Sequence, residues 1–299
     1  MRPFRFGLAA TIASSRDEWV AMARHAEQLG YHVFLMPDHT GRQLAPVPGL
    51  MAVADATTRL RIGSLVFAND YRHPVLLAKE VATLDVLSGG RFELGIGAGW
   101  ATRDYERMGI PYDRPGVRIA RMVEAIHLLK RLFTEEAVDF NGTYYRAKRA
   151  RLSPLPLQRP HPPLMIGGGG PRILSIAARE ADIVAVQPQS DARGRHRPGD
   201  LTGGATARKI EVIKKASGDR FAGLEIQAYV VDAEVGTLAA QAKRLPFALV
   251  DSPYFLYGSK EQVRDDLLRR RERFGISYYS IPYWAMESFA PVVAELAGR

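Results

Sequence analysis

Short apolar segments of strand length alternate with longer amphipathic segments along almost the whole chain. The apolar segments lie at 4–9, 32–37, 61–67, 91–98, 163–169, 182–187, 225–232 and 276–282. Most gaps carry helical spacing; Trp19, Met22, Ala26 and Leu29, for example, follow one another by three, four and three residues. Eight strands mostly separated by helices predict an α/β fold, a (β/α)8 TIM barrel formed by residues 1–299 as one domain. A doubly wound open sheet is the alternative, but the number of strands argues against it.

Two segments depart from this repeat. Residues 138–150 contain an Asn-Gly turn flanked by aromatic residues, which predicts a β-hairpin. Residues 188–206 are polar and rich in glycine, with few apolar side chains to anchor them. They predict a long mobile loop after the sixth strand, where it could serve as a lid.

The composition narrows the possible functions. The chain has no cysteine, which excludes disulfides, thiolate metal sites and cysteine nucleophiles. No histidine pair has the spacing of a helical metal site, so we expect no bound metal. The N-terminus lacks the apolar core of a signal peptide, and no apolar run is long enough to span a membrane. We therefore expect a cytoplasmic protein with no membrane partner.

The charge balance is basic, with Lys and Arg outnumbering Asp and Glu by 41 to 32. Such a balance suits an acidic cofactor, nucleic acid, or solubility alone. The basic residues are spread along the chain, and no recognised nucleic-acid module accompanies them. We expect no nucleic-acid partner.

Polar and aromatic residues follow several of the predicted strands directly. In a barrel, the carboxyl ends of the strands form the face that carries activity. Asp38 and His39 follow the second strand, Trp100 the fourth, and Tyr283 and Trp284 the eighth. Of the seven histidines, His39 stands directly at a strand end beside a carboxylate, which suits a proton carrier near neutral pH. The neighbouring Asp38 could accept hydrogen bonds from a ligand.

The segment MIGGGGPRILSIAARE, residues 165–180, predicts a phosphate pocket. A strand ends in four glycines, Pro171 begins a helix, and Arg172 follows in its first turn. Backbone N–H groups at a helix N-terminus bind anions, and Arg172 can add charge. A flexible strand-to-helix turn is the alternative, but four consecutive glycines exceed what a turn needs.

The segment LSGGRFELGIGAGW, residues 87–100, places Gly95, Gly97 and Gly99 on one face of a strand. A glycine face lets a flat ligand lie against the backbone. A crowded barrel interior in which only glycine fits is the other interpretation, and the two are compatible. Glu93 shares this face, and we expect it to be a buried, paired carboxylate rather than a catalyst.

Several segments together resemble the luciferase-like monooxygenase superfamily, in its branch that depends on the deazaflavin coenzyme F420. They are AEQLGYHVFLMPDH, RLRIGSLVFANDYRHPVLLAKEVATLDVLSGGRFELGIGAGW, PPLMIGGGGPRILSIAAREAD and YGSKEQVRDDLLRRRERFGI. The resemblance runs in order over nearly the whole chain. It implies a (β/α)8 barrel, often a homodimer, that binds the coenzyme at the rim described above.

The resemblance also assigns residues around the coenzyme. It implies that Asp38 contacts the coenzyme and that His39 serves as proton donor. It places the phosphate against Gly168, Gly169 and Gly170, with Arg172 nearby.

The resemblance further implies a bulge after the third strand, often with a non-prolyl cis peptide, that supports the ring. This bulge would fall within Ser64, Leu65, Val66 and Phe67, and Asn69 would lie near the polar edge of the ring. The ring itself would lie over the glycines of the third and fourth strands, among them Gly97 and Gly99.

One position departs from the family pattern. In the sugar-phosphate dehydrogenase branch, a Glu that acts as base follows the glycine strand, whereas this chain has Trp100 there. Oxidation of glucose 6-phosphate by that mechanism is therefore disfavoured. We expect a bulkier apolar substrate in contact with Trp100, Tyr283 and Trp284.

The resulting functional hypothesis is an oxidoreductase that moves a hydride between coenzyme F420 and a small organic substrate. A monooxygenase that uses reduced FMN and oxygen is the near alternative, because both cofactors are planar and phosphorylated. A barrel that binds flavin without catalysis is a third. The sequence alone leaves open the substrate and the direction of hydride transfer.

Overall fold

The computed structural model describes residues 1–191, 193–237, 249 and 251–299. Its main sheet is closed: nine strands pair in the order β3-β2-β1-β13-β10-β9-β8-β5-β4, and β3 also pairs with β5. Every pairing in this sheet is parallel. Because the short strands β3 and β4 share one position beside β5, the barrel has eight positions. The predicted (β/α)8 barrel is confirmed.

The barrel strands lie within a few residues of the predicted segments. They are β1 (Arg5–Ala9), β2 (Val33–Met36), β3 (Arg61–Ser64), β4 (Phe67–Ala68), β5 (Phe92–Gly97), β8 (Leu164–Gly168), β9 (Ile183–Val186), β10 (Glu225–Tyr229) and β13 (Ile276–Pro282).

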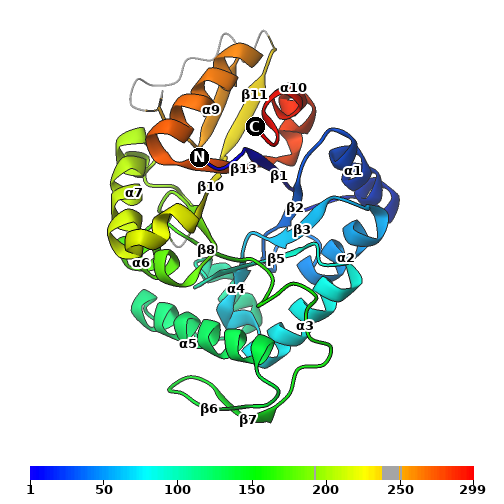
Figure 1. Ribbon diagram of the computed structural model, residues 1–299, viewed down its shortest axis with the longest axis vertical. Helices are drawn as coiled ribbons and strands as arrows, with labels where there is room; N and C mark the ends of the chain where they lie inside the picture. The colour runs from blue at the N-terminus through cyan, green and yellow to red at the C-terminus, as the bar shows by residue number, and fades with distance from the viewer. Residues whose placement is uncertain (192, 238–248, 250) are drawn as a thin grey trace.

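Helices cover the outside of the barrel (Figure 1). They are α1 (Arg16–Gln28), α2 (Pro46–Ala56), α3 (Pro74–Leu87), α4 (Thr102–Met108), α5 (Pro115–Thr134), α6 (Pro171–Glu180), α7 (Gly203–Ser217), α9 (Lys260–Phe274) and α10 (Met286–Leu296). Four of them begin with proline, whose fixed φ suits the first helical position and whose missing N–H costs nothing there.

Two apolar clusters hold the barrel together. The larger lies between strands and helices and includes Phe34, Ile62 and Phe92. The smaller includes Leu35, Met165 and other residues whose side chains alternate with those of the first along the strands, as expected for the two faces of a closed sheet.

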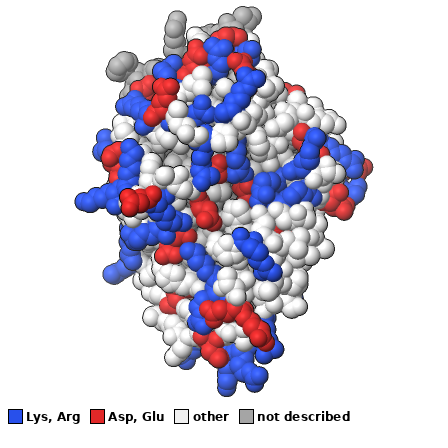
Figure 2. Space-filling model, in the orientation of Figure 1, with Lys and Arg blue, Asp and Glu red and all other residues white. Residues whose placement is uncertain are grey.

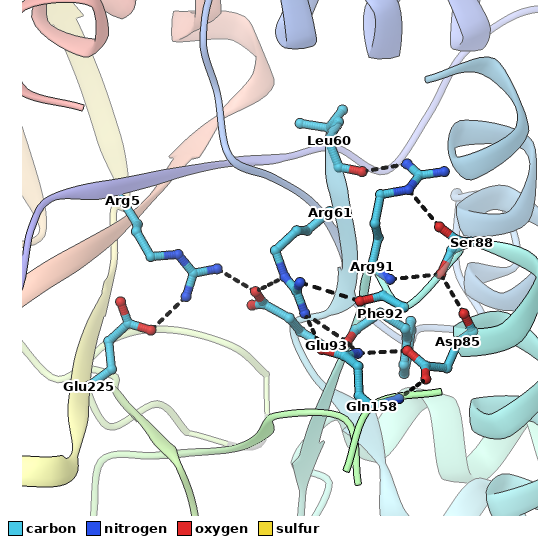
Figure 3. A network of polar contacts seen from close by, with 11 residues as sticks. Arg5, Leu60, Arg61, Asp85, Ser88, Arg91, Phe92, Glu93, Gln158 and Glu225 are labelled. Carbon is cyan, nitrogen blue, oxygen red and sulfur yellow. Dashed lines mark hydrogen bonds and ion pairs between the residues drawn. The ribbon is translucent and has the colours of Figure 1, made fainter. Parts of the chain in front are cut away.

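A charged network lies at the amino ends of the strands (Figure 3). Glu93 is 1% exposed and pairs with Arg5 and, at 2.6 Å, with Nε of Arg61. Arg5 also contacts Glu225 at 2.6 Å, and Arg61 donates to Gln158 at 2.9 Å. The prediction that Glu93 is a buried, paired carboxylate is confirmed. Its position at the end of the barrel away from the carboxyl ends of the strands indicates a role in stability.

Replacing Glu93 by glutamine is expected to lower the free energy of unfolding by about 3 kcal/mol, because it removes the buried carboxylate that the partly buried guanidinium groups of Arg5 and Arg61 share. Denaturant unfolding measures this. The surface variant Glu106→Gln on α4 should change stability by less than about 0.5 kcal/mol. A Glu93→Gln protein as stable as the parent would show that the network contributes nothing net.

The predicted hairpin is confirmed as the antiparallel pair β6 (Val138–Asn141) and β7 (Arg146–Ala150). Its turn is held onto α5 by the Glu124 carboxylate, which accepts the backbone N–H groups of residues 143, 144 and 145 at 2.7–2.9 Å.

The segment predicted as a mobile loop, 188–206, has local structure among its described residues. Ser190 and His196 form an antiparallel bridge, a 3-10 turn spans Pro198–Asp200, and α7 begins at Gly203. Its helical end was not predicted, and its mobility stays a prediction. A further pair of parallel strands outside the main sheet, β11 (Asp232–Val235) and β12 (Phe255–Gly258), was also not predicted.

On the face shown in Figure 2, basic and acidic side chains are interspersed. In the part of the chain that the structure describes, no helix is both long and apolar enough to cross a membrane. The cytoplasmic location, the homodimer and the expected lack of nucleic-acid partners stay predictions.

Candidate active site

A cavity of about 660 Å³ opens at the carboxyl ends of the barrel strands. It brings together eleven of the residues predicted from the sequence. They are Asp38, His39, Leu65, Val66, Gly97, Gly99, Trp100, Gly168, Gly169, Tyr283 and Trp284. Cavities of this size are typical of sites for cofactors and small molecules.

Three predicted residues at or after the end of β3 do not line the cavity. The Ser64 hydroxyl donates to the carbonyl oxygen of Gly95 at 2.8 Å, and Phe67 is fully buried in the outer core. Asn69 is 2% exposed and donates to the Tyr145 hydroxyl at 2.9 Å. These contacts join neighbouring strands and attach the hairpin, so they do not place these side chains at the edge of a ring.

Two residues predicted to bind phosphate also stand outside the lining. Gly170 is the N-cap residue of α6. The Arg172 guanidinium lies beside the first turn of α5, with Nη1 3.1 Å from the point where a Cβ on Gly116 would lie. The glycines that do reach the cavity are Gly168 and Gly169.

The break between β3 and β4 shapes one wall of the cavity. The peptide bond between Leu65 and Val66 is cis, as the resemblance implied, and both side chains line the cavity. A Cβ on Gly95 would lie 2.0 Å from the carbonyl oxygen of Ser64, and one on Gly97 would lie 2.7 Å from Val66. The glycine face of β5 therefore makes room for this bulge, as the interpretation of a crowded interior predicted.

Asp38 is held by the protein itself. Arg72 donates to both of its carboxylate oxygens, at 2.8 and 3.3 Å, and the backbone N–H of Ala68 donates at 3.1 Å. Asp38 is 7% exposed and lines the cavity, so it joins β2 to the segment after the bulge. Its carboxylate has a structural partner that the sequence did not indicate.

His39 forms a pair with Asp104 of α4. Its Nδ1 lies 2.7 Å from Asp104 Oδ2, and Asp104 is 3% exposed. Burial alone would raise the pKa of the Asp104 carboxyl, but hydrogen bonds from Thr40 and His39 outweigh it and hold the pKa below its usual value. An ionised carboxylate only accepts hydrogen bonds, so Nδ1 of His39 is the donor. In the neutral imidazole, Nε2 is then a free base.

Aromatic side chains form the mouth of the cavity. The rings of His39 and Trp100 meet edge to face with centroids 5.3 Å apart. On its other side, Trp100 approaches Gly194, where a Cβ would lie 2.8 Å from the indole. Trp284 donates to Asp232 at 3.2 Å and packs edge to face on Tyr283. Trp100 and Trp284 are 44% and 59% exposed, an unusual exposure for indoles that suits contact with a ligand.

Asp104 and His196 are among the residues of this site that were not predicted from the sequence. Asp104 stands in the segment ATRDYE after the fourth strand, where a carboxylate in the first turn of a helix was the available signal. His196 lines the cavity, and its Nδ1 lies 2.8 Å from the Ser190 hydroxyl. Burial, reinforced by the positive charge of Lys209, lowers the pKa of His196 and favours its neutral form.

A family model described as luciferase-like monooxygenase matches residues 2–216. The chain belongs to the luciferase-like monooxygenase family. Within that family it is 32% identical over 189 residues to an F420-dependent glucose-6-phosphate dehydrogenase of Nakamurella multipartita. This alignment covers 60% of this chain and 55% of that relative, so the chain spans about half the length of this curated relative.

Other luciferase-like proteins resemble the chain as well. It is 33% identical to an FMNH(2)-dependent dimethylsulfone monooxygenase of Pseudomonas putida over 131 residues, 44% of this chain and 36% of that protein. The coenzyme F420-dependent tetrahydromethanopterin reductase of Methanopyrus kandleri superposes with a TM-score of 0.80 at 16% identity, covering 98% of this chain and 99% of that one. This last likeness establishes the fold alone.

Proposed function

We propose that this protein is a coenzyme F420-dependent oxidoreductase that transfers a hydride between the deazaflavin and a small uncharged organic substrate. The observation that carries the proposal is the pairing of His39, which lines the cavity, with the buried Asp104. It leaves Nε2 of His39 able to take a proton from a substrate hydroxyl or, when protonated, to return it. The F420-dependent relative supports the choice of coenzyme.

The residues present fit such a coenzyme. Gly168 and Gly169 offer backbone without side chains at the phosphate end, and Leu65 and Val66 form a wall against which a ring can lie. The cavity volume of about 660 Å³ falls within the range that planar cofactors and their substrates occupy. When bound, a deazaflavin gives or accepts a hydride at its C5 carbon, which cannot form the peroxide that reduced flavins form with oxygen.

The charges of the cavity support an uncharged substrate. Among the described residues that line it, the arginines are Arg42 and Arg118. Arg118 is 4% exposed and donates to the backbone carbonyls of residues 98, 99 and 113 and to the Tyr112 hydroxyl. Its charge is therefore committed to the protein, whereas Arg42 is exposed and open to an anionic group such as that of the coenzyme. With Trp100 in place of the carboxylate of the sugar-phosphate branch, this wall suits an aromatic or aliphatic alcohol or ketone.

The tautomer of His39 supports alcohol oxidation as one direction of the reaction. Neutral His39 keeps its proton on Nδ1, so Nε2 begins as an acceptor. It can take the hydroxyl proton while the carbinol hydrogen leaves as hydride. In the opposite direction the imidazolium, stabilised by Asp104, returns that proton to the carbonyl oxygen.

The coenzyme is tested by titrating the purified protein with F420 and with FMN, following fluorescence. We expect saturable binding of F420 in the micromolar range, about −8 kcal/mol, and weaker binding of FMN. An FMN-dependent monooxygenase is the second candidate, because the Pseudomonas putida relative uses reduced FMN. Micromolar binding of FMN without any response to F420 would overturn the proposal in favour of that candidate.

A further inference from the structure

Lys209 of α7 is a buried lysine behind the wall of the cavity. Its side chain is 6% exposed. The ammonium donates to the backbone carbonyl oxygen of Gln187 at 2.8 Å and to Asp200 Oδ2 at 2.6 Å. A buried ammonium is costly unless it is paired and hydrogen-bonded. These two contacts, with a longer one of 3.4 Å to the Tyr254 hydroxyl, satisfy it. Of these four residues, only Gln187 lines the cavity.

Asp200 completes the arrangement from the other side. The same Oδ2 accepts the backbone N–H of Gln189 at 2.5 Å. Lys209 and Asp200 together therefore hold the carbonyl of residue 187 and the N–H of residue 189. We call residues 187–189 the cavity strap; all three line the cavity.

The cavity strap packs directly against the glycine turn after β8. A Cβ on Gly169 would lie 2.5 Å from the carbonyl oxygen of Gln187 and 3.0 Å from the backbone nitrogen of Gln189. The Gln189 side chain also donates to the carbonyl oxygen of Gly169, at 3.4 Å. Both of the nearest atoms belong to the backbone, so the strap and the turn are in direct contact along their main chains.

We propose that the Lys209–Asp200 pair holds the cavity strap against Gly169 through hydrogen bonds to its backbone. In this position the strap sets the affinity of the glycine turn for the phosphate end of the coenzyme. This inference rests on the proposed function, in which that turn receives the phosphate. Neither side chain needs to touch the coenzyme. The pair acts through the backbone of residues 187 and 189, whose positions fix the N–H groups that the turn presents.

The test uses the variants Lys209→Met and Asp200→Ala, with F420 as the titrant. Each leaves one backbone group of the cavity strap without its partner. We expect the Kd for F420 to rise about tenfold in either variant. At saturating coenzyme kcat should stay within about twofold of the parent, because the His39–Asp104 pair is untouched. If Lys209→Met does not fold, Asp200→Ala tests the proposal by itself, because the Asp200 side chain is more exposed than that of Lys209.

The double variant separates a shared device from two unrelated effects. Because the two residues act as a unit, Lys209→Met with Asp200→Ala should bind F420 within about twofold of either single variant. Additive losses, about 100-fold together, would contradict the proposal. Lys214→Met, on the exposed face of the same helix, is the matched control and should keep the parent Kd.

Loss of thermal stability with an unchanged Kd for F420 would show a merely structural role and overturn this inference. That outcome would leave the proposed function standing, because the parent would still bind F420. If the parent itself binds no F420, the proposed function fails first and the inference falls with it.

Discussion

Replacing His39 by glutamine is expected to lower kcat by about 10²- to 10⁴-fold, the range that a positioned general acid or base contributes. Glutamine keeps a polar side chain of similar length but cannot exchange a proton near neutral pH. The Kd for F420 should change by less than about twofold, since no part of the proposed phosphate site is altered. Steady-state rates with an alcohol substrate, together with an F420 titration, measure both quantities.

The matched control for this change is His127→Gln. His127 lies on α5, is 52% exposed, and faces Glu180 at 3.6 Å, outside the cavity lining. Its replacement should leave kcat unchanged. If His39→Gln keeps the parent rate with any substrate that turns over, His39 has no proton role. A parent protein that binds F420 but turns over no substrate in a broad panel of alcohols and ketones would instead favour the barrel that binds flavin without catalysis.

The fold follows closely from the apolar pattern, for a physical reason. Strands of a parallel barrel are buried on both faces, so each one appears as a short apolar run such as Val33–Met36. The start of α6 was equally visible, since Pro171 occupies its first helical position. The apolar pattern did not predict breaks within a strand. Residues 61–67 form one apolar run in the sequence, but in the structure they belong to two strands separated by a cis peptide bond.

The candidate site was only partly visible in the sequence, because its pairings are long-range. The two members of the His39–Asp104 pair are 65 positions apart, and Arg72 lies 34 positions from Asp38. Nothing in a local motif shows which of several carboxylates will face a given histidine. The same limit applies to Asn69, whose partner on the hairpin is 76 positions away. The ends of strands can be predicted from sequence periodicity. Which side chains meet across the barrel becomes visible only once the closed sheet places the strands next to one another.

The division of roles between Asp38 and its neighbour changes accordingly. The resemblance implied that Asp38 contacts the coenzyme and that His39 carries the proton. In the structure, both oxygens of Asp38 are engaged by Arg72, which also approaches Glu80 at 3.4 Å. Asp38 therefore anchors the segment that carries the bulge, and any contact with the coenzyme uses a carboxylate already neutralised by a guanidinium. The carboxylate that pairs with His39 is instead that of Asp104 on α4.

Replacing Asp104 by asparagine is expected to lower kcat for alcohol oxidation by about 100-fold, the lower end of what general acid–base catalysis supplies. An asparagine amide can donate to Nδ1 of His39, which moves the imidazole proton to Nε2 and removes the free base. Asp104 is a positioning residue in this argument, because it acts through His39. Asp104→Glu keeps the charge and should recover most of the rate, whereas the exposed Asp17→Asn should have no effect.

The pH dependence separates this role from simple loop anchoring. Hydrogen bonds hold the pKa of Asp104 below its usual value despite burial. The ionised carboxylate therefore contributes fully to folding stability above the usual pKa of an aspartate. This contribution is lost only as the pH falls through the lowered pKa. Across neutral pH the carboxylate is therefore ionised throughout. The rate loss in Asp104→Asn should then reflect the imidazole alone. An Asp104→Asn protein with the parent rate and the parent pH profile would reduce Asp104 to an anchor for Thr40.

The two directions of the reaction share one transition state, so at a given pH Asp104→Asn should lower kcat/KM by the same factor in both. Oxidation needs Nε2 of His39 as an acceptor, and the asparagine variant places a proton there. Reduction needs the imidazolium as donor, and the variant lacks the carboxylate that stabilises it. We therefore expect kcat/KM for the matching ketone also to fall by about 100-fold. A comparable rise in the Kd for F420 would mean instead that the substitution disturbs binding or packing rather than the tautomer of His39.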